Sequence, residues 1–420
     1  MRVEKRFLIP ASRLATAVKF LSALLCAVPG LQAQSLMQSR IPGGHVNVYN
    51  SDLAVLEAQM ERDDLPCSVN PVKPFLGFDL RFHAGYEVVV PLKDIAGSED
   101  LLTMVMRVTP LQNGGDVAYF SQRIFVPKMS EDMKGNAYLQ GVFDLGEGKY
   151  KIDWLMRDRS ERVCSSYWDA EAELPSKDRD LALMIGANTV EEAEREPFRE
   201  EPPVDRKDGE TFNVKVLVNF APQKAHASTL QPLDVNALVS ILRSIAREPR
   251  ITKFSLIAFN MQEQRVIYRQ ETSGHIDFPA LGDALESIKL GVVDLKKLSE
   301  KNSDTKFLTD LITSELTTED EPDALIFAGP KVMLDEKVPE SSLKEVGSLD
   351  YPVYYMNYNF NPRMNPWRDA IGNAVKFFRG QEFTISRPRD LWFAWTEIMS
   401  NIVKLKGKRT TAANATSSTQ

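Results

Sequence analysis

The strongest constraint on the fold is an alternation of short apolar runs with amphipathic stretches between Phe212 and Val403. The apolar runs are residues 214–219, 254–259, 266–268, 324–328, 353–358 and 383–385. Between most of these runs, apolar residues recur at helical spacing behind typical helix-start residues such as Asp234, Asp277, Asn365 and Pro388. Strands that alternate with helices form a largely parallel sheet covered by helices. The sequence therefore predicts an α/β domain.

The third strand of this domain is expected to run against the others. A short turn at residues 260–264 leads into the third run, and a connection this short permits a hairpin but no crossover to a parallel strand. Residues 211–404 are thus predicted to form a doubly wound, six-stranded sheet with one reversed strand.

Upstream, from residue 71 to residue 174, the apolar period changes to two. Seven alternating runs are expected to be strands, at residues 76–82, 86–92, 102–108, 117–125, 138–143, 150–156 and 163–168. Short strands of this kind, separated by turn residues, are typical of an antiparallel β-sandwich. The turn and strand around Tyr150 resemble the tyrosine corner of immunoglobulin-like domains, with Ile152 where antibody domains place a cysteine. This resemblance implies an immunoglobulin-like sandwich for residues 71–174.

Three segments outside these two domains have their own composition. Residues 34–70 are polar and mixed, and an irregular lead-in with a short helix is expected there. Residues 191–208 hold eight acidic side chains and three prolines, so residues 175–210 are predicted to be a stiff, solvated linker, with a regulatory acidic segment as the alternative. Residues 405–420 are rich in Thr, Ser, Ala and Lys and are expected to be disordered.

Residues 1–33 have the pattern of a secretory signal peptide. Basic residues precede the apolar run 20–28, which is too short to span a bilayer, and Ala33 is a plausible cleavage residue. The alternative is a core helix. Export predicts a periplasmic or secreted protein, in which Cys67 and Cys164 would be the remaining cysteines.

Cys67 precedes the first predicted strand and Cys164 lies in the last, so the two are expected to form a disulfide, with two buried thiols as the alternative.

Charge and motifs exclude several functions. The chain has a net charge of -7, which becomes -11 without residues 1–33, so sequence-independent binding of nucleic acid is not expected. No His-Glu-x-x-His motif, phosphate-binding loop, dinucleotide fingerprint or Gly-x-Ser-x-Gly elbow occurs. We therefore predict a protein that is not an enzyme and has no cofactor; an envelope hydrolase with a cleft between the domains is the alternative.

The predicted order of strands and helices in residues 211–404 resembles the von Willebrand factor type A fold. The segment 380–391 is similar to the last strand and helix start of secreted bacterial VWFA-related proteins. The resemblance implies a metal-ion-dependent adhesion site, in which one loop supplies Asp-x-Ser-x-Ser, a second Thr and a third Asp.

This chain departs from that metal-site pattern. The matching positions are Asn219, Ala221 and Gln223 in the first loop, Thr272 or Ser273 in the second, and Ala328 in the third. One hydroxyl and two amides are a poor cage for a hard cation. The sequence therefore predicts no bound metal, and an adhesion module with atypical ligands is the alternative.

The remaining candidate is a group of aromatic residues between Tyr351 and Trp367, interleaved with asparagines. Loops at the carboxyl ends of parallel strands are where such sheets bind ligands. Tyr358, Phe360 and Trp367 are therefore the binding candidates for an unknown protein or glycan, and the alternative is that these rings pack under a neighbouring helix. The predicted function is an exported interaction protein that acts through these loops.

Overall fold

The computed structural model describes residues 34–37, 48–112, 115–194, 196–206, 211–224, 227, 229–288, 290, 302–317 and 322–417, with side chains to residue 407. The chain divides into two compact units. The first comprises mainly residues 82–173, with the segments up to residue 75 and from 185 to 193. The second comprises residues 76–81, 174–184 and 194–420. The predicted signal peptide lies outside the described residues. No helix in the described ranges is long and apolar enough to cross a membrane.

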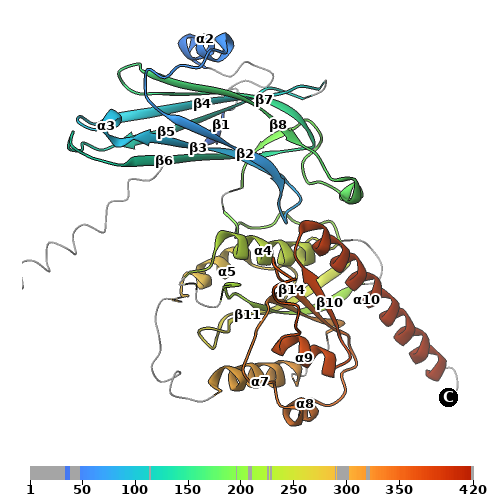
Figure 1. Cartoon of the computed structure of the whole chain (residues 1–420). Coiled ribbons are helices and arrows are strands. Elements are labelled where there is room, and N and C mark those ends of the chain that lie inside the picture. The colour runs from blue at the N-terminus through green and yellow to red at the C-terminus, as the bar shows by residue number, and fades with distance from the viewer. Residues whose placement is uncertain are drawn as a thin grey trace, which may run out of the picture. The chain divides into compact units, whose positions relative to one another are not determined.

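The first unit is a β-sandwich (Figure 1). One sheet has the order β1-β5-β4-β7-β8, formed by β1 (Ser35–Leu36), β5 (Ala118–Val126), β4 (Asp100–Pro110), β7 (Gly148–Arg157) and β8 (Val163–Ala172). The other has the order β2-β3-β6-β9, formed by β2 (Ser68–Leu76), β3 (Phe82–Pro91), β6 (Asn136–Leu145) and β9 (Val190–Glu192). Two short helices, α2 (Asn50–Ala58) and α3 (Leu92–Ile95), flank the sheets.

Aromatic side chains from the two sheets meet in the core of this unit. The ring of Trp154 on β7 lies 5.5 Å from that of Tyr86 on β3, and the Phe120 and Phe143 rings lie 5.8 Å apart. The Tyr150 hydroxyl donates to the Gly146 carbonyl at 2.8 Å, which is the hydrogen bond expected from the tyrosine-corner pattern. The coarse prediction of an antiparallel sandwich is therefore confirmed.

The first predicted strand, residues 76–82, is wrong. Residues 77–81 form a turn in which the Gly77 amide donates to the Arg81 carbonyl, while β2 ends at Leu76. Phe78, which supplied part of the alternating pattern, is buried in the core of the second unit. Of the four alternating residues, Phe78 and Phe82 are buried, in different units, whereas Leu76 and Leu80 are half-buried. Alternation alone does not say to which core a buried side chain belongs.

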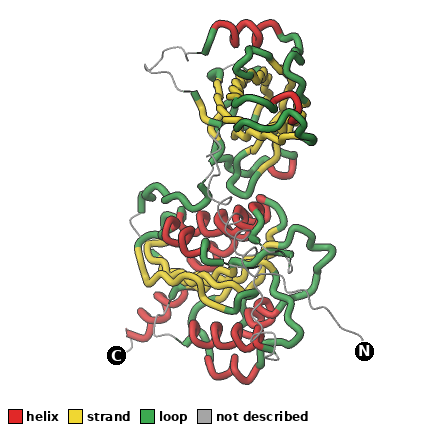
Figure 2. Tube along the Cα trace, turned by 90° about the vertical axis from the view of Figure 1, so that its left-hand side faces the viewer, coloured by secondary structure: helices red, strands yellow, loops and turns green. Residues whose placement is uncertain are grey.

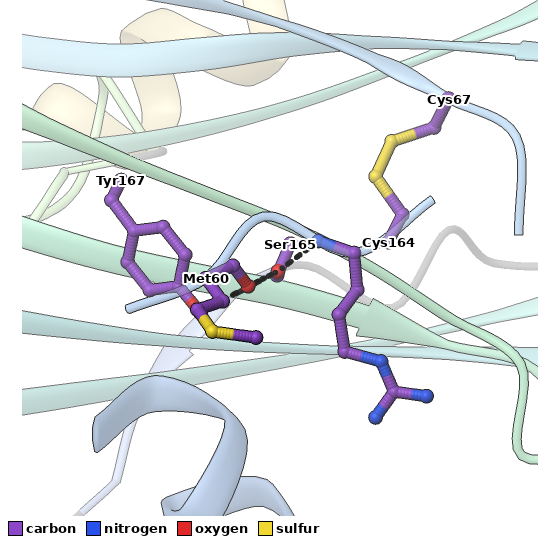
Figure 3. The surroundings of a disulfide bond; sticks show 6 residues. Met60, Cys67, Cys164, Ser165 and Tyr167 are labelled. Carbon is purple, nitrogen blue, oxygen red and sulfur yellow. Dashed lines mark hydrogen bonds between the residues drawn. A yellow bond between two sulfur atoms is a disulfide. The ribbon is translucent and has the colours of Figure 1, made fainter. Parts of the chain in front are cut away.

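The predicted disulfide is confirmed: Cys67 and Cys164 are bonded, with their Cα atoms 6.2 Å apart (Figure 3). The segment just before Cys67 lies against β8, since the Arg62 amide donates to the Ser165 hydroxyl at 3.0 Å and the Leu65 amide to the Val163 carbonyl at 3.1 Å. The bond therefore fixes the entry into β2 to the last long strand of the sandwich.

The second unit contains a six-stranded sheet of order β12-β11-β10-β13-β14-β15. Its strands are β10 (Phe212–Asn219), β11 (Ile251–Asn260), β12 (Arg265–Ser273), β13 (Ala324–Pro330), β14 (Val353–Tyr358) and β15 (Gln381–Ile385). All neighbours pair in parallel except β11 and β12, which are antiparallel. The predicted six strands, the third reversed, are confirmed.

Helices cover both faces of this sheet (Figures 1 and 2). One face packs against α4 (Pro232–Ala246), α5 (Phe278–Leu285) and α10 (Pro388–Ser417). The other packs against α7 (Ser303–Leu316), α8 (Glu340–Val346) and α9 (Ala370–Phe377). Such a doubly wound sheet places the carboxyl ends of its parallel strands at one edge, where ligands bind in this class of fold.

The solvated linker predicted for residues 175–210 is wrong over the described part of that segment. Strand β9 pairs with β6, and Leu181 and Ile185 are buried. Glu194 lies 2.6 Å from Arg243 of α4, and Glu201 lies 2.6 Å from both Arg243 and Arg247. These arginines compensate the acidic charge that would otherwise repel itself in solution.

Two further boundaries differ from expectation. The tail predicted to be disordered from residue 405 continues α10 as far as Ser417. The lead-in 34–70 contains the predicted short helix as α2, together with β1 and the beginning of β2, so it is less irregular than expected.

Candidate functional site

The candidate site is the edge of the sheet where β10, β11, β13, β14 and β15 end. Asn219 is the last residue of β10, and Tyr358 is the last residue of β14. Three of the predicted metal-site positions, Asn219, Ala221 and Ala328, do come together there, since Ala328 pairs with Val218 beside Asn219. The structure therefore brings the first-loop and third-loop positions to one edge.

Asn219 is fully buried, and the oxygen of its side-chain amide is already engaged. Its Oδ1 accepts from the Met261 amide at 3.1 Å, which leaves its amino group as the remaining polar end. A Cβ on the neighbouring Gly329 would lie 2.7 Å from the Asn219 Cβ, so a bulkier residue at position 329 would need the backbone to shift. This close packing leaves Asn219 poorly placed to ligate a cation.

Gln223 contributes to loop structure. Its Nε2 donates to Asn359 Oδ1 at 3.2 Å, and the Asn359 Nδ2 donates to the Asn365 carbonyl at 3.0 Å. The first loop is thereby tied to the loop that follows β14. The position that would hold a hydroxyl in an adhesion site instead orients a second loop.

Thr272 and Ser273 do not belong to this edge, so that prediction is wrong. Ser273 pairs with Phe254 near the start of β11, and the Thr272 hydroxyl lies 3.1 Å from the Ser255 hydroxyl. Because β12 runs antiparallel to β11, its end lies at the opposite edge of the sheet from Asn219. The same reversed strand that the sequence predicts therefore excludes these hydroxyls from the site.

The residues present do not fit a hard divalent cation. Such ions prefer six or more oxygen ligands, several of them carboxylates, whereas Ala221 and Ala328 offer no side-chain oxygen and Asn219 Oδ1 already accepts a hydrogen bond. Among the described residues, no group of three or more His, Cys, Asp or Glu side chains is placed to hold a metal ion.

Two of the three aromatic candidates pack against the core, Tyr358 as a buried residue and Phe360 as a partly buried one, which corrects their selection as surface groups. Tyr358 is fully buried, and its hydroxyl donates to the Ala221 carbonyl at 2.9 Å. Burial and the nearby Asp234 carboxylate raise the pKa of Tyr358 above its usual range. Phe360 lies between Tyr358 and Phe78, with ring centroids 5.4 and 5.9 Å away. The alternative, that these rings pack under a neighbouring helix, therefore describes Tyr358 and Phe360 better than exposure does.

Trp367 is exposed over 66% of its surface. It shares its loop with Met364, which is 80% exposed, and Met333 on the loop after β13 is 54% exposed. We call Met333, Met364 and Trp367 the Met-Trp surface. Neither methionine is predicted as a site residue from the sequence, because methionine is an apolar side chain that is often buried. The turn residues around Met364 are the one local signal of its exposure.

Lys331 at the end of β13 joins the two loops of the Met-Trp surface. Its ammonium group donates to the Trp367 carbonyl at 2.7 Å and to the Asn365 carbonyl at 3.3 Å. Because these carbonyls lie on the loop after β14, the charge of Lys331 holds that loop beside the residues that lead to Met333.

Asp369 makes the second connection between the loops. Its Oδ2 accepts from the Val332 amide at 2.6 Å and from the Tyr355 hydroxyl at 2.9 Å, while Oδ1 accepts from the Gly372 amide at 2.8 Å. Asp369 is thus the N-cap of α9, in place of the Asn365 cap expected from the sequence. The same carboxylate fixes Val332, the neighbour of Met333.

The pKa of Asp369 is raised to about 6, because burial outweighs the hydrogen bonds from Val332, Gly372 and Tyr355. An acid whose pKa is higher in the folded state stabilises the fold when protonated, and this stability is lost as pH rises towards 6. We expect the free energy of unfolding of wild type, relative to Asp369→Asn, to fall by about 2 kcal/mol between pH 4 and pH 7. Urea unfolding of wild type and of Asp369→Asn across this pH range measures the difference in free energy. Parallel pH profiles of the two proteins would contradict the prediction.

Comparison with known proteins adds no family. No family model matches this chain, and no curated protein matches it significantly. Among solved structures, a minor pilin PilB from Streptococcus sanguinis is similar at a TM-score of 0.24 and 8% identity, over 71% of this chain and 87% of the pilin.

Two glycosidases are also similar. A β-glucuronidase from Bacteroides uniformis has a TM-score of 0.18 and 10% identity, over 74% of this chain and 38% of the enzyme. A GH3 β-glucosidase from Bifidobacterium adolescentis has a TM-score of 0.16 and 11% identity, over 26% of this chain and 18% of the enzyme. This chain therefore spans less than two fifths of the length of either glycosidase. Scores this low support no argument about function.

Proposed function

We propose that this chain is an exported interaction protein that binds a protein partner through the Met-Trp surface without a divalent cation. In this proposal the first unit is an immunoglobulin-like sandwich, and the second is a von Willebrand A-like domain without its metal site. The strand order of the sheet, with its reversed third strand, supports the second assignment. The pattern of residues 1–33 supports export.

The observation that carries the proposal is the exposure of Trp367 and Met364 on a loop whose backbone is held in place. Tryptophan is enriched among residues that dominate binding energy, and methionine adapts to irregular partner surfaces. A loop already fixed by Lys331, Asn359 and Asp369 loses little conformational entropy on binding. Exposed apolar side chains with a rigid support are what a binding surface requires.

The alternatives have weaker support at this edge. An adhesion module with atypical ligands would need oxygen ligands where Ala221 and Ala328 stand. A hydrolase would need titratable groups that reach a substrate, but Asp369 and Tyr355 are buried and hydrogen-bonded to each other. Neither residue is placed to contact a substrate.

Capture from a cell-envelope extract tests the proposal. Immobilised full-length protein is expected to retain a partner equally in EDTA and in Ca2+ or Mg2+. Trp367→Ala combined with Met364→Ala should reduce retention at least about tenfold, the effect of losing roughly 1.4 kcal/mol of binding energy at a central contact.

Phe393→Ala is the matched control, because Phe393 is also exposed but lies on α10. It should retain the partner as wild type does. Undiminished retention of the partner by the variant with Trp367→Ala and Met364→Ala would contradict the assignment of the Met-Trp surface as the binding surface. Loss of the partner in EDTA, together with a rise in melting temperature on adding Ca2+, would favour the metal-dependent alternative.

A further inference from the structure

The loop after β14, which carries Met364 and Trp367, has two arginines and no acidic side chain before Asp369. Lys331 lies at the end of β13, and Arg363 and Arg368 lie on the loop after β14. Two carboxylates lie close to them: Asp369, which is buried, and Glu382, which pairs with Arg368 at 2.9 Å. The whole chain, in contrast, has a net charge of -7. The apolar surface is thus bordered by cations on an acidic protein.

Arg363 is the cation of this group that the loop presents outward. Lys331 is directed to two loop carbonyls, and Arg368 is held by Glu382. Arg363 is exposed and stands next to Met364, in the turn where the Met364 amide donates to the Asn361 carbonyl at 2.9 Å. A guanidinium in this position can bind a carboxylate through two parallel hydrogen bonds.

Asp335 and Glu336 follow Met333 on the loop after β13, where both are exposed and the exposed Lys337 comes next. With Lys331, this loop therefore has no net charge, and the positive charge belongs to the loop after β14. The loop after β14 contains no acidic side chain between Tyr358 and Asp369. Charge complementarity therefore favours a partner with negative charge opposite this loop.

We propose that the partner presents an acidic peptide segment in which an apolar side chain lies beside Asp or Glu. The apolar side chain contacts Trp367 and Met364, and the carboxylate binds the Arg363 guanidinium. This inference rests on the proposed function and adds the chemistry of the partner to it. Since the loop is fixed before binding, the spacing between apolar and acidic groups in the partner is expected to be well defined.

An acidic segment fits these residues better than an anionic membrane surface. Interfacial binding uses a broad apolar face and several free basic residues. Here the apolar surface consists of three side chains, and two of the three cations are held by the protein itself. A single outward guanidinium suits one carboxylate rather than a layer of phosphates.

A library of random linear peptides displayed on phage tests the proposal with the full-length protein as the target. The selected peptides are expected to be enriched in an apolar residue next to Asp or Glu. Arg363→Glu should weaken a selected peptide at least about tenfold, and Trp367→Ala by a similar factor. A peptide with Lys in place of its acid should bind Arg363→Glu better than it binds wild type.

Lys376→Glu is the matched control, since Lys376 is an exposed cation on α9 outside the loops; it should change binding less than about twofold. Peptides that depend on Trp367 but carry no acid and ignore Arg363→Glu would overturn this inference while leaving the proposed function intact. Peptides that bind independently of Trp367, or no selected peptide, would overturn both. Binding to vesicles of phosphatidylcholine and phosphatidylglycerol, lost in Arg363→Glu, would overturn the peptide proposal in favour of a lipid surface.

Discussion

Replacing Cys67 and Cys164 by alanine should lower the free energy of unfolding of the sandwich unit by about 2–4 kcal/mol. The two cysteines are 97 residues apart, and a crosslink over so long a loop removes much of the conformational freedom of the unfolded chain. Alanine is the suitable replacement because Cys164 is only 3% exposed. A serine hydroxyl there would be buried without a defined partner.

The loss should be confined to the sandwich. Hydrogen exchange measured by mass spectrometry at increasing urea concentration separates the two units, since peptides from β7 and β8 report the first and peptides from β13 and β14 the second. Treating the wild type with a reductant should reproduce the profile of the double variant. Equal exchange of β7 and β8 in oxidised wild type and the variant would show that the bond contributes no stability.

The segment before Cys67 should respond most strongly. It is held to β8 by two backbone hydrogen bonds, from the Leu65 amide to the Val163 carbonyl and from the Ser165 amide to the Arg62 carbonyl at 2.9 Å. The Arg62 amide also donates to the Ser165 hydroxyl at 3.0 Å. These bonds are partly exposed and near the edge of the sheet, where local opening costs little. Without the disulfide, residues 60–67 are expected to exchange before the strands do.

The order of the α/β unit was predictable because each of its signals is local. Apolar runs mark the buried strands on their own, and Asp277 caps α5 by accepting from the Ala280 amide at 2.9 Å, as its position in the sequence indicates. The start of α9 was not predicted correctly, because its cap depends on residues that are distant in the sequence. Asn365-Pro366 is an acceptable start signal, but Asp369 becomes the cap because Val332 and Tyr355, distant in sequence, also donate to it.

The candidate surface was only partly predictable, because exposure depends on what the rest of the chain covers. Tyr358 and Trp367 are both aromatic residues near one loop, yet Tyr358 is buried and Trp367 is exposed. Phe360 is covered in part by Phe78, more than 200 residues earlier in the chain. Likewise, the acidic stretch around Glu194 resembles a linker until the arginines of α4 are seen beside it. No local sequence pattern contains the contact between Phe78 and Phe360 or the ion pair between Glu194 and Arg243.

The second large effect is expected at a buried ion cluster in the α/β unit. Lys215 on β10 is 4% exposed and Glu315 on α7 is 2% exposed. The Lys215 ammonium lies 2.9 Å from both the carboxylate and the backbone carbonyl of Glu315, and Arg269 of β12 lies 2.5 Å from the same carboxylate. Burial raises the pKa of Glu315, but the hydrogen bonds from Arg269 and Lys215 outweigh it and hold that pKa below its usual range.

Glu315→Ala should therefore destabilise the α/β unit by about 3–5 kcal/mol, because it leaves the Lys215 charge in the interior without compensation. Changing both partners, in Lys215→Met with Glu315→Leu, should recover most of this loss, since well-packed apolar groups replace a buried pair at little cost. Urea unfolding of Lys215→Met, of Glu315→Leu and of the double variant gives the coupling energy between the two side chains. If the double variant were as unstable as Glu315→Ala, the loss would come from packing or from Arg269 rather than from an uncompensated charge on Lys215.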